Sequence, residues 1–78
     1  MAKLELYGTS RCPHTQEMRE WLEWKRSDFV EYDVEADAGA RRRMRELAPG
    51  QRSVPLLVED GKVAQVGWQG RSCMIDAE

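Results

Sequence analysis

The alternation of apolar and polar positions predicts a strand and then a helix in the first third of the chain. Leu4-Glu5-Leu6-Tyr7 alternates and stops at Gly8, which is typical of a short strand. Pro13 suits the first turn of a helix, because the N–H that it lacks would be unpaired there. Side chains of one helical face then recur at intervals of three and four: Met18, Trp21, Leu22 and Lys25. We expect this helix to end near Ser27.

The middle of the chain repeats the same order of elements. The segment from Phe29 to Val34 is rich in β-branched and aromatic residues and predicts a second strand. Asp37 is a suitable N-cap for a second helix, and Pro49-Gly50 would end that helix. The buried stripe of this second helix consists of Ala40, Met44, Leu47 and Ala48.

The last third predicts a hairpin and a short helical tail. Residues 54–59 and 62–66 read as strands, and Asp60-Gly61 between them favours a two-residue turn. Residues 71–78 give at most two helical turns. The order is therefore βαβαββ with a helical tail. Two strands joined by a helix should be parallel, so we expect a mixed four-stranded sheet with helices on its faces, an α/β sandwich.

Length and composition limit the classes of function. The 78 residues suffice for one small domain, residues 1–78. A net charge of −2 gives no reason to expect a nucleic-acid partner, and the apolar runs are too short to span a membrane. We expect a cytoplasmic monomer. In that reducing compartment a structural disulfide is not expected, so both cysteines should serve chemistry or the core.

The stretch Thr9-Ser10-Arg11-Cys12-Pro13-His14-Thr15 holds the clearest chemical signal. Cys12 lies just before the N-terminus of the predicted helix, where backbone N–H groups and Arg11 favour a thiolate. Thiolates attack disulfides. Thr15 occupies the place in which a C-P-x-C motif would carry its second thiol. The Thr15 hydroxyl would either donate a hydrogen bond to the Cys12 sulfur or bond backbone in the first helical turn.

These motifs together resemble the glutaredoxins of the thioredoxin-like superfold. The motif Gln51-Arg52-Ser53-Val54-Pro55 is similar to the Q-R-T-V-P of that family, and Trp68-Gln69-Gly70 to the W-S-G of redoxins that serve ribonucleotide reductase. With Cys12-Pro13-His14-Thr15 and Cys73, the chain also resembles the glutaredoxin-like UXX-star group. Some members of that group carry selenocysteine at the position of Cys12.

The resemblance implies roles for several further residues. Pro55 would follow a cis peptide bond, and the Val54 backbone would pair with an extended substrate peptide beside the Cys12 sulfur. Trp68, with Gly70 in the same turn, would either pack on a small C-terminal core or form part of the rim around Cys12. Arg42 would either lie on a solvated helix face or hold the glycine carboxylate of glutathione. Arg11 would replace a lysine that many glutaredoxins carry before the cysteine.

Two residues keep alternative interpretations. His14 is either a proton donor to a leaving thiolate or, as we favour, a solvent-exposed residue at a variable position. Cys73 would serve as the resolving thiol that Thr15 replaced if its Cα lies within about 7 Å of that of Cys12. The alternative, which we favour, is a small buried hydrophobe under the short C-terminal helix.

The leading functional prediction is a monothiol thiol–disulfide oxidoreductase with Cys12 as its nucleophile. Its substrate would be a disulfide-bearing protein or a small-molecule disulfide, and glutathione or a thioredoxin-type reductase would recycle it. Glutathione is the expected reductant or ligand, and no metal is expected. The alternatives are an iron–sulfur or glutathione-dependent carrier, since some monothiol relatives hold a [2Fe–2S] cluster, and a thiol or selenol peroxide reductase.

Overall fold

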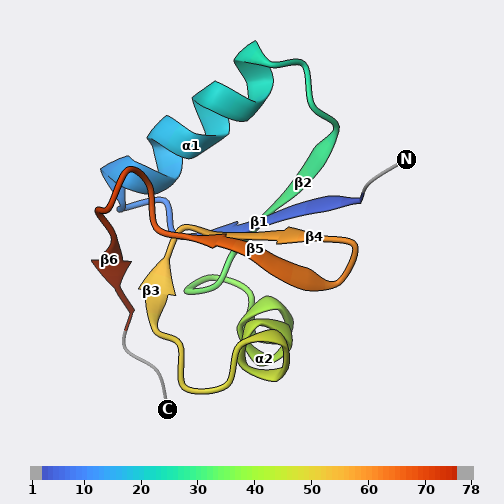
Figure 1. Ribbon diagram of the computed structural model, residues 1–78. Helices are drawn as coiled ribbons and strands as arrows, with labels where there is room; N and C mark the ends of the chain where they lie inside the picture. Colours follow the sequence, from blue (N-terminus) through green and yellow to red (C-terminus); the bar gives the residue numbers. More distant parts are fainter. Residues whose placement is uncertain (1–2, 76–78) are drawn as a thin grey trace.

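The central feature of the computed structural model, which describes residues 3–75, is a four-stranded mixed sheet (Figure 1). Its strands are β1 (Leu4–Gly8), β2 (Phe29–Asp33), β4 (Leu56–Glu59) and β5 (Lys62–Val66), in the order β2-β1-β4-β5. β1 runs parallel to β2 and antiparallel to β4, and β4 and β5 form the predicted hairpin. The thioredoxin-like α/β fold expected from the sequence is thus confirmed.

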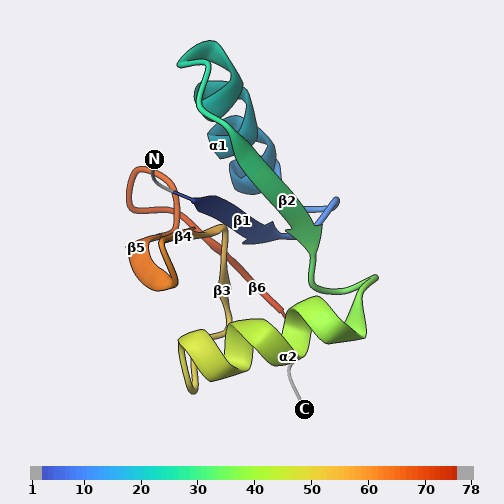
Figure 2. The same cartoon turned by 90° about the vertical axis from the view of Figure 1, so that its right-hand side faces the viewer.

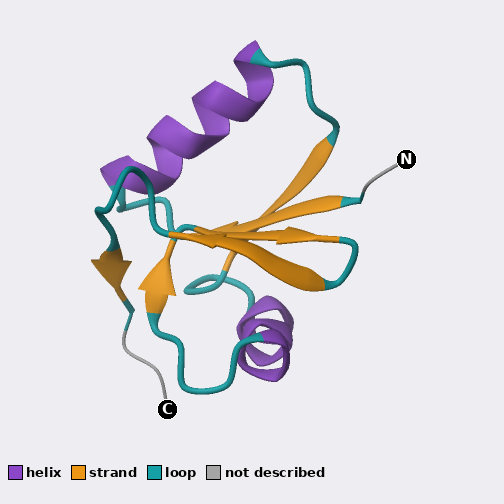
Figure 3. Ribbon diagram, in the orientation of Figure 1, coloured by secondary structure: helices purple, strands orange, loops and turns teal. Residues whose placement is uncertain are grey.

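Two helices cover opposite faces of this sheet (Figures 1 and 3). They are α1 (Pro13–Trp24) and α2 (Ala38–Leu47), and a quarter turn of the molecule shows the sheet between them (Figure 2). Each face has its own cluster of buried side chains. The α1 core consists of Leu6, Met18, Leu22 and Leu57. The α2 core consists of Tyr7, Cys12, Val34, Ala40, Met44, Val54, Leu56, Val58 and Ile75.

Helix α1 ends at Trp24, three residues before the predicted end. Arg26 adopts a left-handed conformation with φ 61°, and the Ser27 N–H reaches back to the Leu22 carbonyl at 3.0 Å. This is the hydrogen bond of a Schellman-type helix end. The buried face agrees with the prediction at Met18 and Leu22, while Trp24 is 79% exposed.

Helix α2 begins where the sequence predicts. The Asp37 carboxylate accepts hydrogen bonds from the backbone N–H groups of Gly39 at 2.9 Å and Ala40 at 3.2 Å, so the predicted N-cap is confirmed. Ala40 and Met44 are fully buried on the predicted stripe. Leu47 and Ala48 are partly buried against the same core.

Two predictions for the end of the chain are wrong. The expected strand 54–59 is interrupted at Pro55, so β3 (Ser53–Val54) is separate from β4. The expected helical tail is a strand where the structure describes it: β6 (Cys73–Met74) pairs antiparallel with β3 in a second, two-stranded sheet. Residues 76–78 of the predicted tail lie outside the described range. Within residues 3–75, neither helix is long and apolar enough to cross a membrane.

Candidate functional site

Cys12 occupies the junction between the loop after β1 and the start of α1. It is the N-cap residue of that helix, with extended backbone angles, and Pro13 follows at the first helical position as predicted. Its carbonyl accepts the first helical hydrogen bond from the Gln16 N–H at 3.3 Å. The side chain is only 2% exposed and packs in the α2 core. The sulfur therefore lies at the positive end of the helix dipole and is shielded from water.

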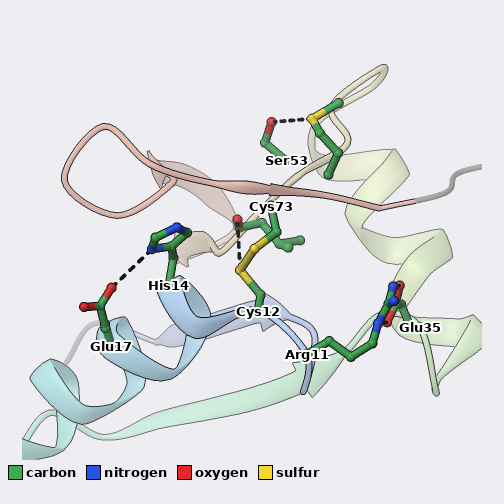
Figure 4. Close-up of a disulfide and its surroundings, with 9 residues drawn as sticks. Arg11, Cys12, His14, Glu17, Glu35, Ser53 and Cys73 are labelled. Atoms are coloured by element: carbon green, nitrogen blue, oxygen red, sulfur yellow. Dashed lines mark hydrogen bonds and ion pairs between the residues drawn. A yellow bond between two sulfur atoms is a disulfide. The ribbon is translucent and has the colours of Figure 1, made fainter.

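A disulfide joins Cys12 to Cys73 across 61 positions of the chain (Figure 4). The two Cα atoms are 6.0 Å apart, within the range that a disulfide can bridge. Our favoured interpretation of Cys73, a small buried hydrophobe under a short C-terminal helix, is therefore wrong. Cys73 lies on β6, and its pairing with β3 brings it to Cys12. The missing second thiol of the C-P-H-T motif thus has a counterpart elsewhere in the chain.

The Val54–Pro55 bond next to this disulfide is cis, as the family resemblance implied. Val54 is fully buried, and its carbonyl oxygen lies 3.9 Å from the Cys12 Sγ. Because a disulfide sulfur carries no proton, this approach is a contact in the oxidised form; a reduced Cys12 thiol has a proton to donate to the same oxygen. Cys73 is the antiparallel partner of Val54, so the edge of β3 that we expected to receive a peptide is already paired.

An open pocket of about 210 Å³ lies beside the disulfide. Both cysteines contribute to its wall, so a reagent in this pocket lies next to the disulfide. The residues that line it are Thr9, Arg11, Cys12, Cys73 and Met74.

Arg11 is the charged side chain of this pocket, and it pairs with Glu35. The guanidinium donates from Nε to Glu35 Oε1 at 3.0 Å, and a second, closer contact joins Nη2 to Oε2 (Figure 4). The carboxylate offsets much of the positive charge next to Cys12. The support that Arg11 was predicted to give a Cys12 thiolate is therefore weakened by Glu35, a partner that the sequence analysis did not predict.

Thr15 packs against the first strand instead of bonding to sulfur. Its hydroxyl oxygen is buried and has no hydrogen-bond partner among residues 3–75, so neither predicted hydrogen bond is present. A Cβ at Gly8 would approach Thr15 Cγ2 to 2.2 Å. The absence of a side chain at Gly8 is what allows helix α1 to sit this close to β1.

His14 lies beside the disulfide but turns toward the helix surface (Figure 4). Its side chain is 21% exposed, and Nδ1 lies 3.2 Å from Glu17 Oε1. It is therefore more buried than we predicted.

Three predicted ligand-binding residues lie outside the pocket wall. Arg42 is exposed on α2. Trp68 packs against the α1 core, where its ring meets that of Trp21 at 5.4 Å between centroids. Gly70 is exposed in the turn after it, with φ 78°. The structure therefore supports neither interpretation of Trp68, a C-terminal core or a rim around Cys12.

Two residues next to Cys73 were missed by the sequence analysis. Met74 lines the pocket and is 68% exposed, while Ile75 is 6% exposed in the α2 core. The alternation of buried and exposed side chains along Cys73-Met74-Ile75 is a strand signal, but three residues are too few to distinguish it from a helical turn. Among the described residues, no cluster of three His, Cys, Asp or Glu side chains is arranged to hold a metal ion.

The α2 core also holds a titratable group with a shifted pKa. Burial raises the pKa of Tyr7 from 10.0 to about 12, the Glu5 carboxylate adds to the shift, and Arg43 opposes it. The Tyr7 hydroxyl donates to Glu5 Oε1 at 3.4 Å, and the ring stacks on Tyr32 at 5.0 Å. Tyr7 is therefore neutral throughout the pH range in which thiols react.

The chain is similar to bacterial proteins described as glutaredoxins. It is 39% identical over 54 residues to a probable glutaredoxin of Synechocystis, which covers 69% of this chain and 50% of that protein. It is 35% identical over 60 residues to an uncharacterised glutaredoxin-like 8.6 kDa protein in the rubredoxin operon of Clostridium pasteurianum, covering 77% and 79%. The chain thus spans half the length of the first of these relatives.

Solved structures agree with this relationship. The thioredoxin-like protein BC3987 superimposes with a TM-score of 0.73 at 33% identity, covering 85% of this chain and 88% of that one. Glutaredoxin 1 of Francisella tularensis shares the fold, with a TM-score of 0.63 at 21% identity and coverage of 87% and 85%. The glutaredoxin family model matches residues 4–64. The chain therefore belongs to the glutaredoxin family.

Proposed function

We propose that this protein is a thiol–disulfide oxidoreductase in which Cys12 attacks and Cys73 resolves. The observation that carries the proposal is the disulfide between a cysteine at a helix N-terminus and a cysteine brought to it by a two-stranded sheet. A cysteine at a helix N-terminus is favoured as a thiolate. The pocket that both cysteines line provides access for a reactant.

The reaction consists of two exchanges. The Cys12 thiolate attacks one sulfur of the substrate disulfide, forms a mixed disulfide and releases the other substrate sulfur as a thiolate. The Cys73 thiolate then attacks the Cys12 sulfur, forms the internal disulfide and releases the second substrate thiolate. Solvent protonates the released thiolates. Two electrons pass from the protein dithiol to the substrate, and an external thiol reductant restores the dithiol.

Glutathione is the reductant that we assign to this cycle, because the glutaredoxin family implies it. The residues favour its role as an attacking thiol over that of a tightly held ligand. The β3 edge is paired with β6 in the disulfide form, and Arg42 does not line the pocket. A first glutathione would attack the internal disulfide through the pocket, and a second would release Cys12 as oxidised glutathione forms. A thioredoxin-type reductase would provide the same two electrons.

The resolving role of Cys73 distinguishes this proposal from a monothiol mechanism. In a monothiol enzyme Cys12 would remain bound to glutathione until a second glutathione arrived. The sequence features shared with the UXX-star group fit either scheme, since the group resemblance rests on Cys12-Pro13-His14-Thr15 and on the later Cys73. We propose that this group is the subfamily of the chain.

Mass spectrometry of the reduced protein after incubation with oxidised glutathione tests this mechanism. We expect the wild type to lose two hydrogen atoms and to yield a Cys12–Cys73 peptide. Cys73→Ser should instead retain one glutathione on Cys12. Cys12→Ser should lose disulfide reduction entirely, with Cys73→Ser as the matched control for the loss of a thiol. Disulfide reduction at the wild-type rate by Cys12→Ser would overturn the proposal, and a lasting wild-type glutathione adduct would overturn the role of Cys73.

A further inference from the structure

The β3 edge beside Cys12 is occupied by a segment of the same chain. β6 runs antiparallel to β3, with Cys73 opposite Val54 and Met74 opposite Ser53. The pairing continues with a hydrogen bond from the Ile75 N–H to the Arg52 carbonyl at 2.9 Å. The Val54 carbonyl is 3.9 Å from the Cys12 sulfur. An extended segment with a cysteine opposite Val54 is therefore placed for a disulfide with Cys12.

The side chains of this segment point alternately into the protein and outward. Cys73 bonds to Cys12, and Ile75, two positions later, is 6% exposed and packs in the α2 core. Met74 between them is 68% exposed, and its sulfur accepts a hydrogen bond from the Ser53 hydroxyl at 3.4 Å. The site thus receives a cysteine and, two residues on, an aliphatic side chain, while it makes little use of the residue between them.

We propose that Cys73-Met74-Ile75 is an internal occupant of the substrate site, and that external substrates are extended protein segments of the form cysteine–any residue–aliphatic. This inference rests on the proposed function. Such a segment would replace β6 on the β3 edge and form the mixed disulfide in the register that Cys73 now holds. Backbone pairing would give affinity regardless of sequence, and the hydrophobic position of Ile75 would give selectivity.

β6 and an external substrate segment compete for the same β3 edge, and this competition sets the order of the steps in the reaction. While the Cys12–Cys73 bond is intact, β6 fills the edge and no external segment can pair with Val54. Reduction leaves β6 held by the two residue pairs of its strand and by Ile75, so it can exchange with a substrate. Return of β6 then brings the Cys73 thiolate to the mixed disulfide, and the substrate leaves as a thiol.

The test is an exchange equilibrium on the full-length Cys73→Ser variant, with Cys12 first converted to its glutathione adduct. Three blocked peptide thiols are added separately: Arg-Ser-Cys-Met-Ile, Arg-Ser-Cys-Met-Ser and Arg-Ser-Cys-Ser-Ile. Intact mass gives the ratio of peptide adduct to glutathione adduct at equilibrium. Burying an isoleucine favours the complex, so the peptide that lacks it should give a ratio lower by at least about tenfold. The peptide that lacks methionine should stay within about twofold of the first, because Met74 is largely exposed.

The outcomes separate this inference from the proposed function. Equal ratios for all three peptides would overturn the inference and leave Cys12 as a working nucleophile. No adduct on Cys12 with glutathione or any peptide would overturn the proposed function itself. Cys73→Ala serves as the second variant if Cys73→Ser does not fold. In either variant, the end of the chain that includes Ile75 still competes with the added peptide for the β3 edge. This competition lowers all three ratios equally.

Discussion

The two cores on opposite faces of the sheet have different chemistry. The α1 core is built from Leu6, Met18, Leu22 and Leu57 and contains no group that titrates or reacts with a disulfide. The α2 core packs against the same strands, but it includes Cys12 and Tyr7 and receives Ile75 from the end of the chain. One face of the sheet therefore holds α1 in place, and the other also holds the redox centre.

This difference indicates which substitutions should have effects on stability that depend on the redox state of the protein or on pH. Oxidation of Cys12 ties β6 to the α2 core, and high pH removes a proton from Tyr7 in the same core. Neither event changes a side chain of the α1 core. A substitution in the α1 core should therefore lower the free energy of unfolding by the same amount in the oxidised and reduced proteins and at every pH. A substitution in the α2 core should lower it by an amount that depends on redox state or pH.

The largest expected effect is that of Leu22→Ala in the α1 core. Leu22 is 1% exposed, so its truncation should lower the free energy of unfolding by about 2–5 kcal/mol. Urea unfolding of the oxidised and reduced proteins measures the loss in each state. We expect equal losses, and a difference above about 1 kcal/mol would show that the two cores are not independent.

Reduction of the disulfide is the matching perturbation of the α2 core. The bond links positions 61 residues apart, so its loss should lower the free energy of unfolding by about 2–4 kcal/mol, since the unfolded chain regains conformational freedom. Urea unfolding with and without reductant measures this difference in the free energy of unfolding. The Cys73→Ser variant, which cannot form the bond, should be equally stable under both conditions. A wild type equally stable in both redox states would contradict the entropic argument.

The main sheet could be predicted from the sequence because its signals are local. Alternation marks β1, the Asp60-Gly61 turn fixes the hairpin, and Asp37 caps α2. Each of these depends on a few neighbouring residues and on burial of one face. The same reasoning located Cys12, because a proline after a cysteine at the start of a helix is also a local pattern.

The second sheet could not be predicted, because β3 and β6 are each two residues long and owe their structure to each other. Residues 53–54 and 73–74 are distant in sequence, and neither pair has an apolar period that specifies a strand. Only the distance between two cysteines in the folded chain could decide whether Cys73 was a partner of Cys12.

The pH dependence of stability should carry a contribution from Tyr7. Its pKa is about 12 in the folded protein and 10.0 ordinarily, so between these values the unfolded chain loses a proton that the folded chain keeps. The contribution is fully present below pH 10 and is lost as pH rises toward 12, by about 1–3 kcal/mol in total. Urea unfolding at intervals from pH 9 to 11 measures the slope. Tyr7→Phe should reduce the slope of the free energy of unfolding against pH. The same slope in the wild type and in Tyr7→Phe would mean that other groups cause the pH dependence.

The smallest expected effect is that of a substitution at Trp68, in the segment that connects the two cores. Trp68 packs against the α1 core through Trp21, yet it lies five residues before Cys73 in the α2 core. Trp68→Leu should lower the free energy of unfolding by about 0.5–1.5 kcal/mol through loss of the aromatic pair. Trp24→Leu is the control, since Trp24 is 79% exposed and its change should stay within about 0.5 kcal/mol. An equal loss in the oxidised and reduced proteins would mean that the turn stays with the α1 core when the disulfide opens. A loss confined to the oxidised protein would mean that the disulfide holds Trp68 in place, and that opening it frees the whole segment from Gly67 to Ile75.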